Sequence, residues 1–425
     1  MRKMSGKWRA LVLAVLLAAL PAGMAGAESF VPRLDSGTAC TLTVAGHYSN
    51  FEALETEFNL FGKYYPDVTL QYVKMDSYNS VIEEALAGDE APDIFFMYPS
   101  MFIDDRYEGL IRQAEDLGDP AAGIDLSCVQ PEVLYRTPEG KIPYVPIFGE
   151  TYGMLVNESI FARQNLAVPE TYADLVAACA VLQASGYANP IMGYSKDFLL
   201  YPLFFPYFCS RIQGDEEALT HLNAMDASAA GYASEALGLA ADFMRYGFFN
   251  VALCDEELTK DYEPVILRFF EGDVPMMLMK SSTVSGTAKR EAKSEAFTKN
   301  PFPYSFHPVP STDEGGYFLD VISMGFAVNG SGSNLEMANE FMRFLVSNEE
   351  LNRIANGNRM VPTAREMMPD SIYAPFGKIY PDRIIYQTRL GLEETPDLQV
   401  RAAGRLVCRG EMTVDEALAA FGSLK

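Results

Sequence analysis

A regular alternation of strand and helix patterns in residues 41–98 constrains the fold more than any other feature of the chain. Short apolar runs predict three buried strands, at residues 41–45, 68–73 and 93–98. The segments between them, residues 51–61 and 77–87, place apolar side chains at helical spacing. This order of strands and helices is typical of a parallel sheet with helices on both faces. We therefore predict an α/β fold in which ligands bind beyond the carboxyl ends of the strands.

The chain after residue 142 predicts a second α/β region. Residues 142–147 contain two prolines and read as extended backbone, and residues 152–156 read as a strand. Helical and apolar segments follow, and residues 306–310 form another extended stretch with prolines. Two such stretches between α/β regions predict two lobes that are joined by at least two crossings of the chain.

Three sites pair a Ser or Thr with an acidic residue three positions later, at Ser49, Thr171 and Thr413. In this pattern the hydroxyl oxygen and the carboxylate each accept a hydrogen bond from a backbone N–H that the helix leaves unpaired. We expect a helix to begin at each site. The aromatic run at residues 198–208 is expected to belong to the core, although its tyrosines are also candidates for a cleft wall.

The chain is acidic, with 33 Lys and Arg against 57 Asp and Glu and a net charge of −24. A nucleic-acid surface needs a basic footprint, so we predict no nucleic-acid partner. The three histidines are scattered and no two cysteines have CxxC spacing, so neither a metal site nor a cofactor is predicted.

The six cysteines leave the disulfide pairing open. Six cysteines allow 15 pairings, and these lie at Cys40, Cys128, Cys179, Cys209, Cys254 and Cys408. Cys179 falls in an apolar helical run, where a buried free thiol is expected.

The first 27 residues predict a secretory signal peptide. Four basic residues precede the apolar run at residues 10–20, which is shorter than the ~20 residues that a membrane span needs. Small residues lead to Ala27. We predict cleavage after Ala27 and export, as a soluble protein, to the periplasm or the outer face of the cell envelope.

Six motifs in order resemble a known family. They read GDEAPDI, YVP with YGMLVN, VPETYADL, FEGDVPMM, GFAV with a following helix, and GEMTVDEA, and begin at residues 88, 144, 168, 270, 325 and 410. The series is similar to the bacterial extracellular solute-binding proteins of the maltose-binding type, the family 1 carbohydrate binders of ABC importers. Two positions depart from the family pattern: Tyr172 replaces a Trp, and Lys280 begins KSST where an aromatic GSW is common.

The resemblance implies a type II periplasmic-binding-protein fold, with two α/β lobes joined by a hinge. Residues 28–146 and 311–347 would form the N-terminal lobe, and residues 147–310 and 348–425 the C-terminal lobe. Chain crossings are expected near residues 143–147, 308–311 and 345–349. The implied function is capture of a small polar solute, a mono- or oligosaccharide, in the interlobe cleft of a monomer that delivers it to ABC permease subunits. The resemblance thus implies a binding protein and not an enzyme.

The cleft of such a fold is lined by loops that follow strands, and ten residues stand at such positions or beside the hinge. Aromatic rings cover the CH faces of sugars, while carboxylates, amides and ammonium groups bond their hydroxyls. The candidate ligand-binding residues are His47, Tyr48, Tyr98, Glu150, Tyr152, Lys280, Ser281, Ser282, Tyr317 and Asp320.

Other classes of function remain open on the sequence alone. A binding protein for a peptide, a polyamine or a metal chelate is one alternative, and the acidic candidates Glu150 and Asp320 would suit a cationic ligand. A secreted hydrolase is another; it would need a Gly-x-Ser-x-Gly elbow, a spaced carboxylate pair or a metal cluster. Ser281-Ser282 has no such setting, and Asp104-Asp105 is a common solvated pair. A cell-surface adhesion protein is a third, which the regular α/β order disfavours.

Overall fold

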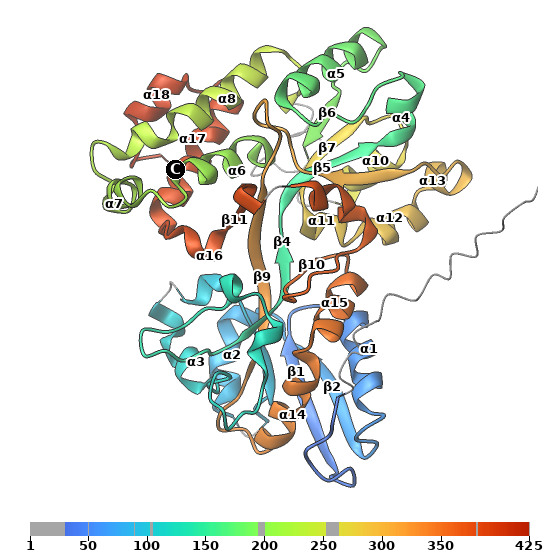
Figure 1. Cartoon of the computed structure of the whole chain (residues 1–425), viewed down its shortest axis with the longest axis vertical. Helices are drawn as coiled ribbons and strands as arrows, with labels where there is room; N and C mark the ends of the chain where they lie inside the picture. The colour runs from blue at the N-terminus through green and yellow to red at the C-terminus, as the bar shows by residue number, and fades with distance from the viewer. Residues whose placement is uncertain are drawn as a thin grey trace, which may run out of the picture.

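The computed structural model has two lobes, one above the other in Figure 1, and the chain passes between them at a narrow waist. The structure describes residues 30–49, 51–88, 90–102, 105–193, 200–251, 263–379 and 381–424. The predicted signal peptide, residues 1–27, lies outside the described residues. Each lobe is built on its own β-sheet flanked by helices, so the predicted α/β fold with two lobes is confirmed.

A seven-stranded sheet forms the centre of the first lobe and extends through the waist. Its order is β10-β4-β9-β3-β1-β2, with β11 paired to β9. The strands are β1 Cys40–Gly46, β2 Val68–Lys74, β3 Ile94–Met97, β4 Val145–Glu150, β9 Phe318–Val328, β10 Val361–Pro362 and β11 Ile384–Tyr386. β1 pairs in parallel with both β2 and β3, which confirms the arrangement predicted from residues 41–98.

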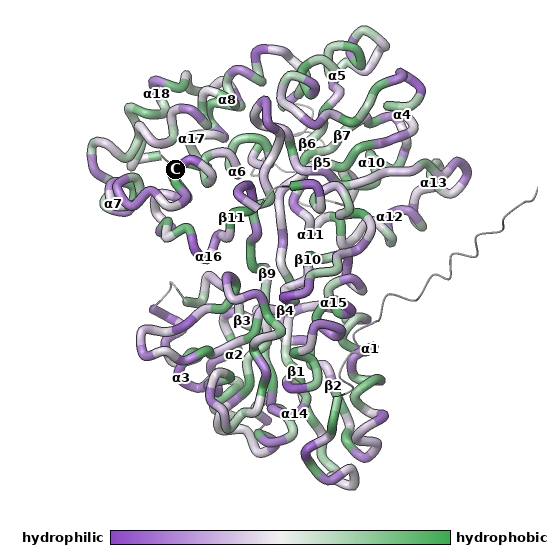
Figure 2. Tube along the Cα trace, in the orientation of Figure 1, coloured by the Kyte–Doolittle hydropathy of each residue, from purple (hydrophilic) through white to green (hydrophobic). Residues whose placement is uncertain are grey.

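Five α-helices belong to the first lobe: α1 Glu52–Phe61, α2 Tyr78–Leu86, α3 Glu108–Gln113, α14 Leu335–Leu345 and α15 Asn348–Gly357. The predicted apolar face of α1 is buried in the core, and Figure 2 shows green and purple alternating along this helix. The expected capping box at Ser49 is wrong. Phe51 precedes the helix with its ring buried in the core, and no side chain caps the helix start.

A four-stranded sheet of order β6-β7-β5-β8 forms the centre of the second lobe. Its strands are β5 Tyr152–Asn157, β6 Ile191–Gly193, β7 Met276–Lys280 and β8 Tyr304–His307. The helices of this lobe are α4 Glu158–Arg163, α5 Tyr172–Ala184, α6 Tyr201–Ile212, α7 Glu216–Ala224, α8 Ser234–Arg245, α10 Glu263–Phe270, α11 Ser281–Val284, α12 Thr287–Lys293, α13 Glu295–Lys299, α16 Gln387–Leu390, α17 Glu394–Cys408 and α18 Val414–Ala419.

In the second lobe, most of the local features predicted from the sequence are present in the structure. Thr171 and Thr413 form capping boxes at the starts of α5 and α18, as predicted. The described part of the aromatic run, residues 200–208, lies almost wholly in the core. The described cysteines are free thiols, and Cys179 is buried as expected; Cys254 lies outside the described residues. Among the described residues, no helix combines the length and apolarity that crossing a membrane requires.

Two long strands carry the chain through the waist. β4 ends at Glu150 and β5 begins at Tyr152, so Thr151 alone separates a strand of one sheet from a strand of the other. β9 starts in the cores of the second lobe at Phe318 and ends in the core of the first lobe at Val328. These crossings differ from the expected ones near residues 143–147 and 308–311, because the strand pairing of β4 with β9 continues past the prolines.

The third crossing lies further along the chain than expected. Residues 345–349 stay within the first lobe, because α15 packs on α1 and buries Leu351 and Ile354 in the first core. The core of the first lobe still includes Ala364, whereas Ile372 belongs to a core of the second lobe. Val361 of β10 already packs in that same core of the second lobe, so the third crossing extends over residues 361–372. This differs from the predicted division, which gives residues 348–425 to the C-terminal lobe. The crossings at Thr151 and within β9 likewise differ from the predicted boundaries at residues 146/147 and 310/311.

Candidate functional site

A cavity of about 1260 Å³ lies between the two lobes. The first lobe contributes loops at the carboxyl ends of β1, β2 and β3, and the second lobe contributes β5, α6, β7 and α17. Strand β9 forms part of the floor. The lining residues are His47, Ser77, Tyr78, Asn79, Ser80, Tyr98, Pro99 and Ser100 from the first lobe, Val321, Ile322 and Ser323 from β9, and Tyr152, Tyr201, Lys280, Gln387, Leu398, Gln399, Arg401, Ala402, Arg405 and Leu424 from the second.

His47 and Tyr98 form a hydrogen-bonded pair on the wall of the first lobe. The Tyr98 hydroxyl lies 2.5 Å from Nδ1 of His47. Burial of part of the His47 ring, which packs on Tyr48 with centroids 4.4 Å apart, lowers the pKa of His47 below its ordinary value. We assign the acceptor role to Nδ1 of this neutral ring. Nε2 then carries the hydrogen and can donate a hydrogen bond to a bound solute.

Tyr48 supports this wall from behind. Its ring packs edge-on against Phe51 and Phe96, with centroids 5.2 and 5.5 Å away, and it is not among the lining residues. Tyr48 therefore positions His47, which is a smaller role than the predicted contact with ligand.

Lys280 and Glu150 form an ion pair at the junction of the lobes. Nζ of Lys280 donates to Oε2 of Glu150 at 2.9 Å, and the Ser323 hydroxyl donates to Oε1 at 2.7 Å. Burial lowers the pKa of Lys280, but the charges of Tyr152 and Glu150 raise it more, so the ammonium form is favoured. Glu150 is not among the lining residues, so this carboxylate does not offer the site for a cationic ligand that the sequence suggested.

Arg401 of α17 is the most firmly held charged group of the cavity. Its Nε and Nη2 donate to the two carboxylate oxygens of Asp397 at 2.7 and 3.1 Å, and Nη1 donates to the Tyr152 hydroxyl at 2.9 Å. The guanidinium also lies 3.7 Å from the ring centroid of Phe205 and 5.3 Å from that of Tyr201. Such contacts fix the orientation of the cation before any ligand arrives.

Besides Tyr48 and Glu150, four more predicted site residues lie away from the cavity lining. Ser281 is buried and makes two hydrogen bonds of 2.9 Å with the backbone of Thr151. The Thr151 N–H donates to the Ser281 hydroxyl oxygen, and the Ser281 N–H donates to the Thr151 carbonyl, so Ser281 stabilises the crossing. Ser282 is half-buried, and its carbonyl accepts a hydrogen bond from Ser285. The guanidinium of Arg383 covers the ring of Tyr317 at 5.1 Å. The side chains of Ser281 and Tyr317 are therefore held by structural contacts.

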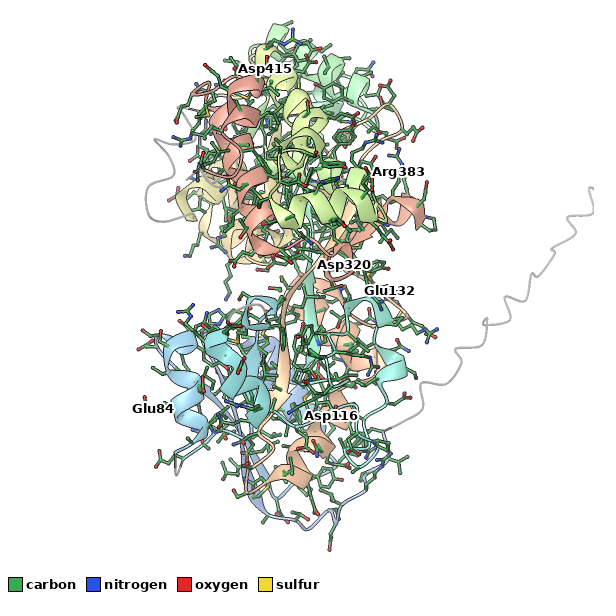
Figure 3. The ribbon with its side chains drawn as sticks, turned by 90° about the vertical axis from the view of Figure 1, so that its left-hand side faces the viewer. Glu84, Asp116, Glu132, Asp320, Arg383 and Asp415 are labelled. Atoms are coloured by element: carbon green, nitrogen blue, oxygen red, sulfur yellow. The ribbon has the colours of Figure 1, made fainter. Side chains whose placement is uncertain are left out.

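Asp320, the fourth, is buried within β9. Its side chain is buried and is not among the lining residues, whereas Val321, Ile322 and Ser323 of the same strand line the cavity. Figure 3 shows Asp320 at the waist, close to Glu132. Its Oδ1 is buried without a hydrogen-bond partner among the described residues, and burial, reinforced by the charge of Glu132, raises the pKa of Asp320 to about 7.

The structure thus brings His47, Tyr98, Tyr152 and Lys280 together, although they are far apart in the sequence. Sequence reasoning missed the first turn of α2 and the cavity-facing side of α17. Ser77, at the start of α2, has a φ of 54°, in the left-handed region. Only the apolar periodicity of α17 is visible in the sequence, and it does not reveal which lobe wall the helix forms.

A second groove of about 1040 Å³ lies on the second lobe and includes a Ser–His contact. The Ser305 hydroxyl donates to Glu158 Oε1 at 2.6 Å and lies 2.7 Å from Nε2 of His307. In a hydrolase the serine hydroxyl donates its hydrogen bond to the histidine, whereas in this groove the hydroxyl of Ser305 donates to Glu158. Burial lowers the pKa of His307 to about 4. The arrangement therefore does not support nucleophilic catalysis.

Comparison with known proteins identifies relatives of the fold. The model of the bacterial extracellular solute-binding protein family matches residues 45–351. A comparison with curated protein sequences finds no match. Among solved structures, the apo form of RafE from Streptococcus pneumoniae is 17% identical, with a TM-score of 0.69, and the match covers 90% of this chain and 97% of RafE.

Two further solved structures have the same architecture. The GacH receptor of Streptomyces glaucescens, solved unliganded and with acarbose, is 18% identical, with a TM-score of 0.65 and coverage of 91% of this chain and 97% of GacH. The sugar transporter BL01359 of Bacillus licheniformis, solved with stachyose, is 15% identical, with a TM-score of 0.60 and coverage of 90% and 98%. With the family match over most of its length, the chain belongs to the bacterial extracellular solute-binding proteins.

Proposed function

We propose that this protein is the exported substrate-binding component of an ABC importer and that it holds a mono- or oligosaccharide between its lobes. The observation that carries the proposal is the cavity, to which both lobes contribute side chains. In the part of the chain that the structure describes, three crossings join the lobes. A solute that contacts both walls favours the closed form, and a permease can distinguish closed from open protein.

The chemistry of the walls suits a sugar. Tyrosine rings and Leu398 offer apolar surface, while hydroxyl, amide and charged groups offer hydrogen bonds. Typical small-molecule pockets measure about 300–1000 Å³. A cavity of about 1260 Å³ therefore leaves room for more than one sugar ring. The sugars bound by GacH and BL01359, acarbose and stachyose, support the same class of solute.

The proposal treats the protein as a binding protein and not as an enzyme. The described lining residues of the cavity include no carboxylate, whereas a glycoside hydrolase requires a pair of them at the scissile bond. Cleavage after Ala27, a monomeric state and delivery to permease subunits are parts of the same proposal. Intact-mass measurement of protein recovered from the cell envelope tests the cleavage site, and a first residue other than Glu28 would contradict it.

Thermal unfolding in the presence of candidate solutes tests the proposed function. A ligand that binds only the folded state stabilises it by ~2.7 kcal/mol at a concentration of one hundred times Kd. We expect sugars to raise the melting temperature, and peptides and polyamines to leave it unchanged. Small-angle scattering with the active sugar should give a smaller radius of gyration than without it. A rise with polyamines or peptides alone would contradict the carbohydrate assignment.

A further inference from the structure

The charged groups that line the interlobe cavity are all cationic. Lys280, Arg401 and Arg405 line it, and the described lining residues include neither Asp nor Glu. The whole chain carries 57 acidic residues against 33 basic ones, so this wall has the opposite character to the rest of the protein. All three cations come from the second lobe.

Two of these cations are fixed by carboxylates that do not themselves line the cavity. Glu150 holds Lys280 at 2.9 Å, and Asp397 holds Arg401 through two hydrogen bonds. Asp397 and Tyr152 together orient the guanidinium of Arg401, while Phe205 covers it at 3.7 Å. Pre-oriented cations lose little conformational entropy when they bind an anion, so such a wall favours charge-assisted hydrogen bonds.

Arg405 extends the cationic wall by one turn of α17. Leu398, Arg401, Ala402 and Arg405 recur at helical spacing and all line the cavity. Their order places apolar side chains between and beside the guanidinium groups. This combination suits a sugar ring that offers a CH face and an anionic substituent at the same edge.

The described residues that line the wall of the first lobe are uncharged and rich in hydroxyl groups. Ser77, Asn79, Ser80 and Ser100 line it, together with the neutral ring of His47. Neutral donors and acceptors of this kind match sugar hydroxyls and do not compete for an anion. The two walls therefore select for different ends of one solute.

We infer that the solute is an anionic sugar whose negatively charged group faces Lys280, Arg401 and Arg405, while its hydroxyls face the first lobe. The inference rests on the proposed function, because it names the charge of the sugar in the same cavity. A uronate carboxylate and a sugar phosphate are two sources of the same anionic chemistry.

Calorimetric titration of the mature protein with matched sugars tests this inference. The probes are trigalacturonate, its fully methyl-esterified form, glucose 6-phosphate, glucose, stachyose and inorganic phosphate. We expect at least one anionic sugar to bind at least ~10-fold more tightly than its neutral counterpart. Raising the salt concentration should narrow this difference, because salt screens the attraction. Preference for trigalacturonate identifies a carboxylate, and preference for glucose 6-phosphate over both glucose and free phosphate identifies a sugar phosphate.

Variants separate a charge effect from a packing effect. Arg405→Gln should weaken binding of the preferred anionic sugar ~10-fold and change binding of its neutral counterpart little. Arg245→Gln is the control, because Arg245 is exposed on α8 and pairs with Asp242 there. It should change neither affinity. The salt dependence of the parent protein tests the same point if Arg405→Gln does not fold.

Other outcomes would overturn the inference. Neutral sugars that bind as tightly as the anionic ones, or an Arg405→Gln variant that weakens both members of a pair equally, contradict the anionic assignment and leave the carbohydrate proposal standing. Tight binding of free phosphate without any sugar preference also contradicts it. If no sugar in the series binds, the proposed function itself fails and the inference fails with it.

Discussion

The ammonium group of Lys280 lies 2.9 Å from Oε2 of Glu150, and this ion pair joins the last residue of β7 to the last residue of β4 beside the crossing between the lobes. The side chains are only 22% and 10% exposed, so water shields the pair weakly. The same pair both ties the crossing to the second lobe and presents a cation to the cavity. Its removal should therefore affect stability and binding together.

Replacing Lys280 by Met should destabilise the protein more than removing the whole pair does. Lys280→Met leaves Glu150 with Ser323 as its remaining side-chain donor and should lower the free energy of unfolding by ~1–3 kcal/mol. The double variant Lys280→Met with Glu150→Gln should recover part of that loss. Lys299→Met, which removes an exposed ion pair on α13, should change stability by less than ~0.5 kcal/mol. Urea unfolding gives all three values, and a double variant less stable than Lys280→Met would contradict this role.

Tyr98 should contribute to affinity through its ring and its hydroxyl. Tyr98→Ala should weaken binding of the active sugar by about 5- to 150-fold, which corresponds to ~1–3 kcal/mol. Tyr98→Phe keeps the ring but loses the hydrogen bond to His47, so a smaller loss is expected. Tyr246→Ala, which alters an exposed tyrosine stacked on Phe248, is the control. Calorimetric affinities for Tyr98→Ala equal to those of the control would remove Tyr98 from the site.

Asp320 should make the protein less stable as the pH rises. The folded protein holds the Asp320 proton up to about pH 7, whereas an unfolded chain loses it near its ordinary pKa of 3.8. The stabilisation is complete below about pH 4 and is lost as the pH rises through 7. Asp320→Asn removes this dependence, so its stability relative to the parent should increase by on the order of 2–3 kcal/mol between pH 5 and pH 8.

Urea unfolding of the parent and of Asp320→Asn at both pH values measures this difference directly. Asp313→Asn, a change of an exposed carboxylate in the loop before β9, serves as the control and should show no such trend. A parent protein that gains stability relative to Asp320→Asn on going from pH 5 to pH 8 would show that Asp320 is ionised in the folded state.

Two glycine substitutions should act in opposite directions. A Cβ atom on Gly325 of β9 would lie 2.3 Å from the backbone oxygen of Val145, which the strand pairing holds in place. Gly325→Ala should therefore destabilise the protein by ~1–3 kcal/mol. A Cβ atom on Gly238 of α8 would meet nothing within 4 Å, so Gly238→Ala should stabilise it by ~0.5–1 kcal/mol. Thermal unfolding of both variants tests the prediction, and a stabilising Gly325→Ala would contradict the close approach of β4 and β9.

The local structure could be predicted from the sequence better than the long-range arrangement could. The parallel pairing of β1 with β2 and β3 and the capping boxes at Thr171 and Thr413 depend on short-range patterns, and the structure contains them. The sequence predicts crossings at the prolines of residues 143–147 and 308–311, whereas the structure has them at Thr151 and within β9. Prolines mark extended backbone but do not reveal where a strand changes lobes. The sequence does not reveal which residues of β9 reach the cavity, which explains why Asp320 is predicted there but does not line it.

The residues of the candidate site show the same difference between local and long-range signals. His47 and Tyr98 directly follow strands and Lys280 is the last residue of one, so the rule for carboxyl ends of strands finds them. Arg401 lies in a helix near the end of the chain, and it reaches the cavity only because α17 packs against α6 and α8. No local pattern predicts such a contact. The cationic character of the cavity wall became visible only in three dimensions.

Hydrogen exchange on the free protein and on the protein saturated with its most stabilising sugar tests most directly whether the solute is held between the lobes. Binding should protect amides in residues 77–80 and 98–100 of the first lobe and in residues 398–405 of the second lobe at the same time. Residues 302–310, in the second groove, should exchange unchanged. Protection confined to one lobe, or to residues 302–310, would contradict capture in the interlobe cavity.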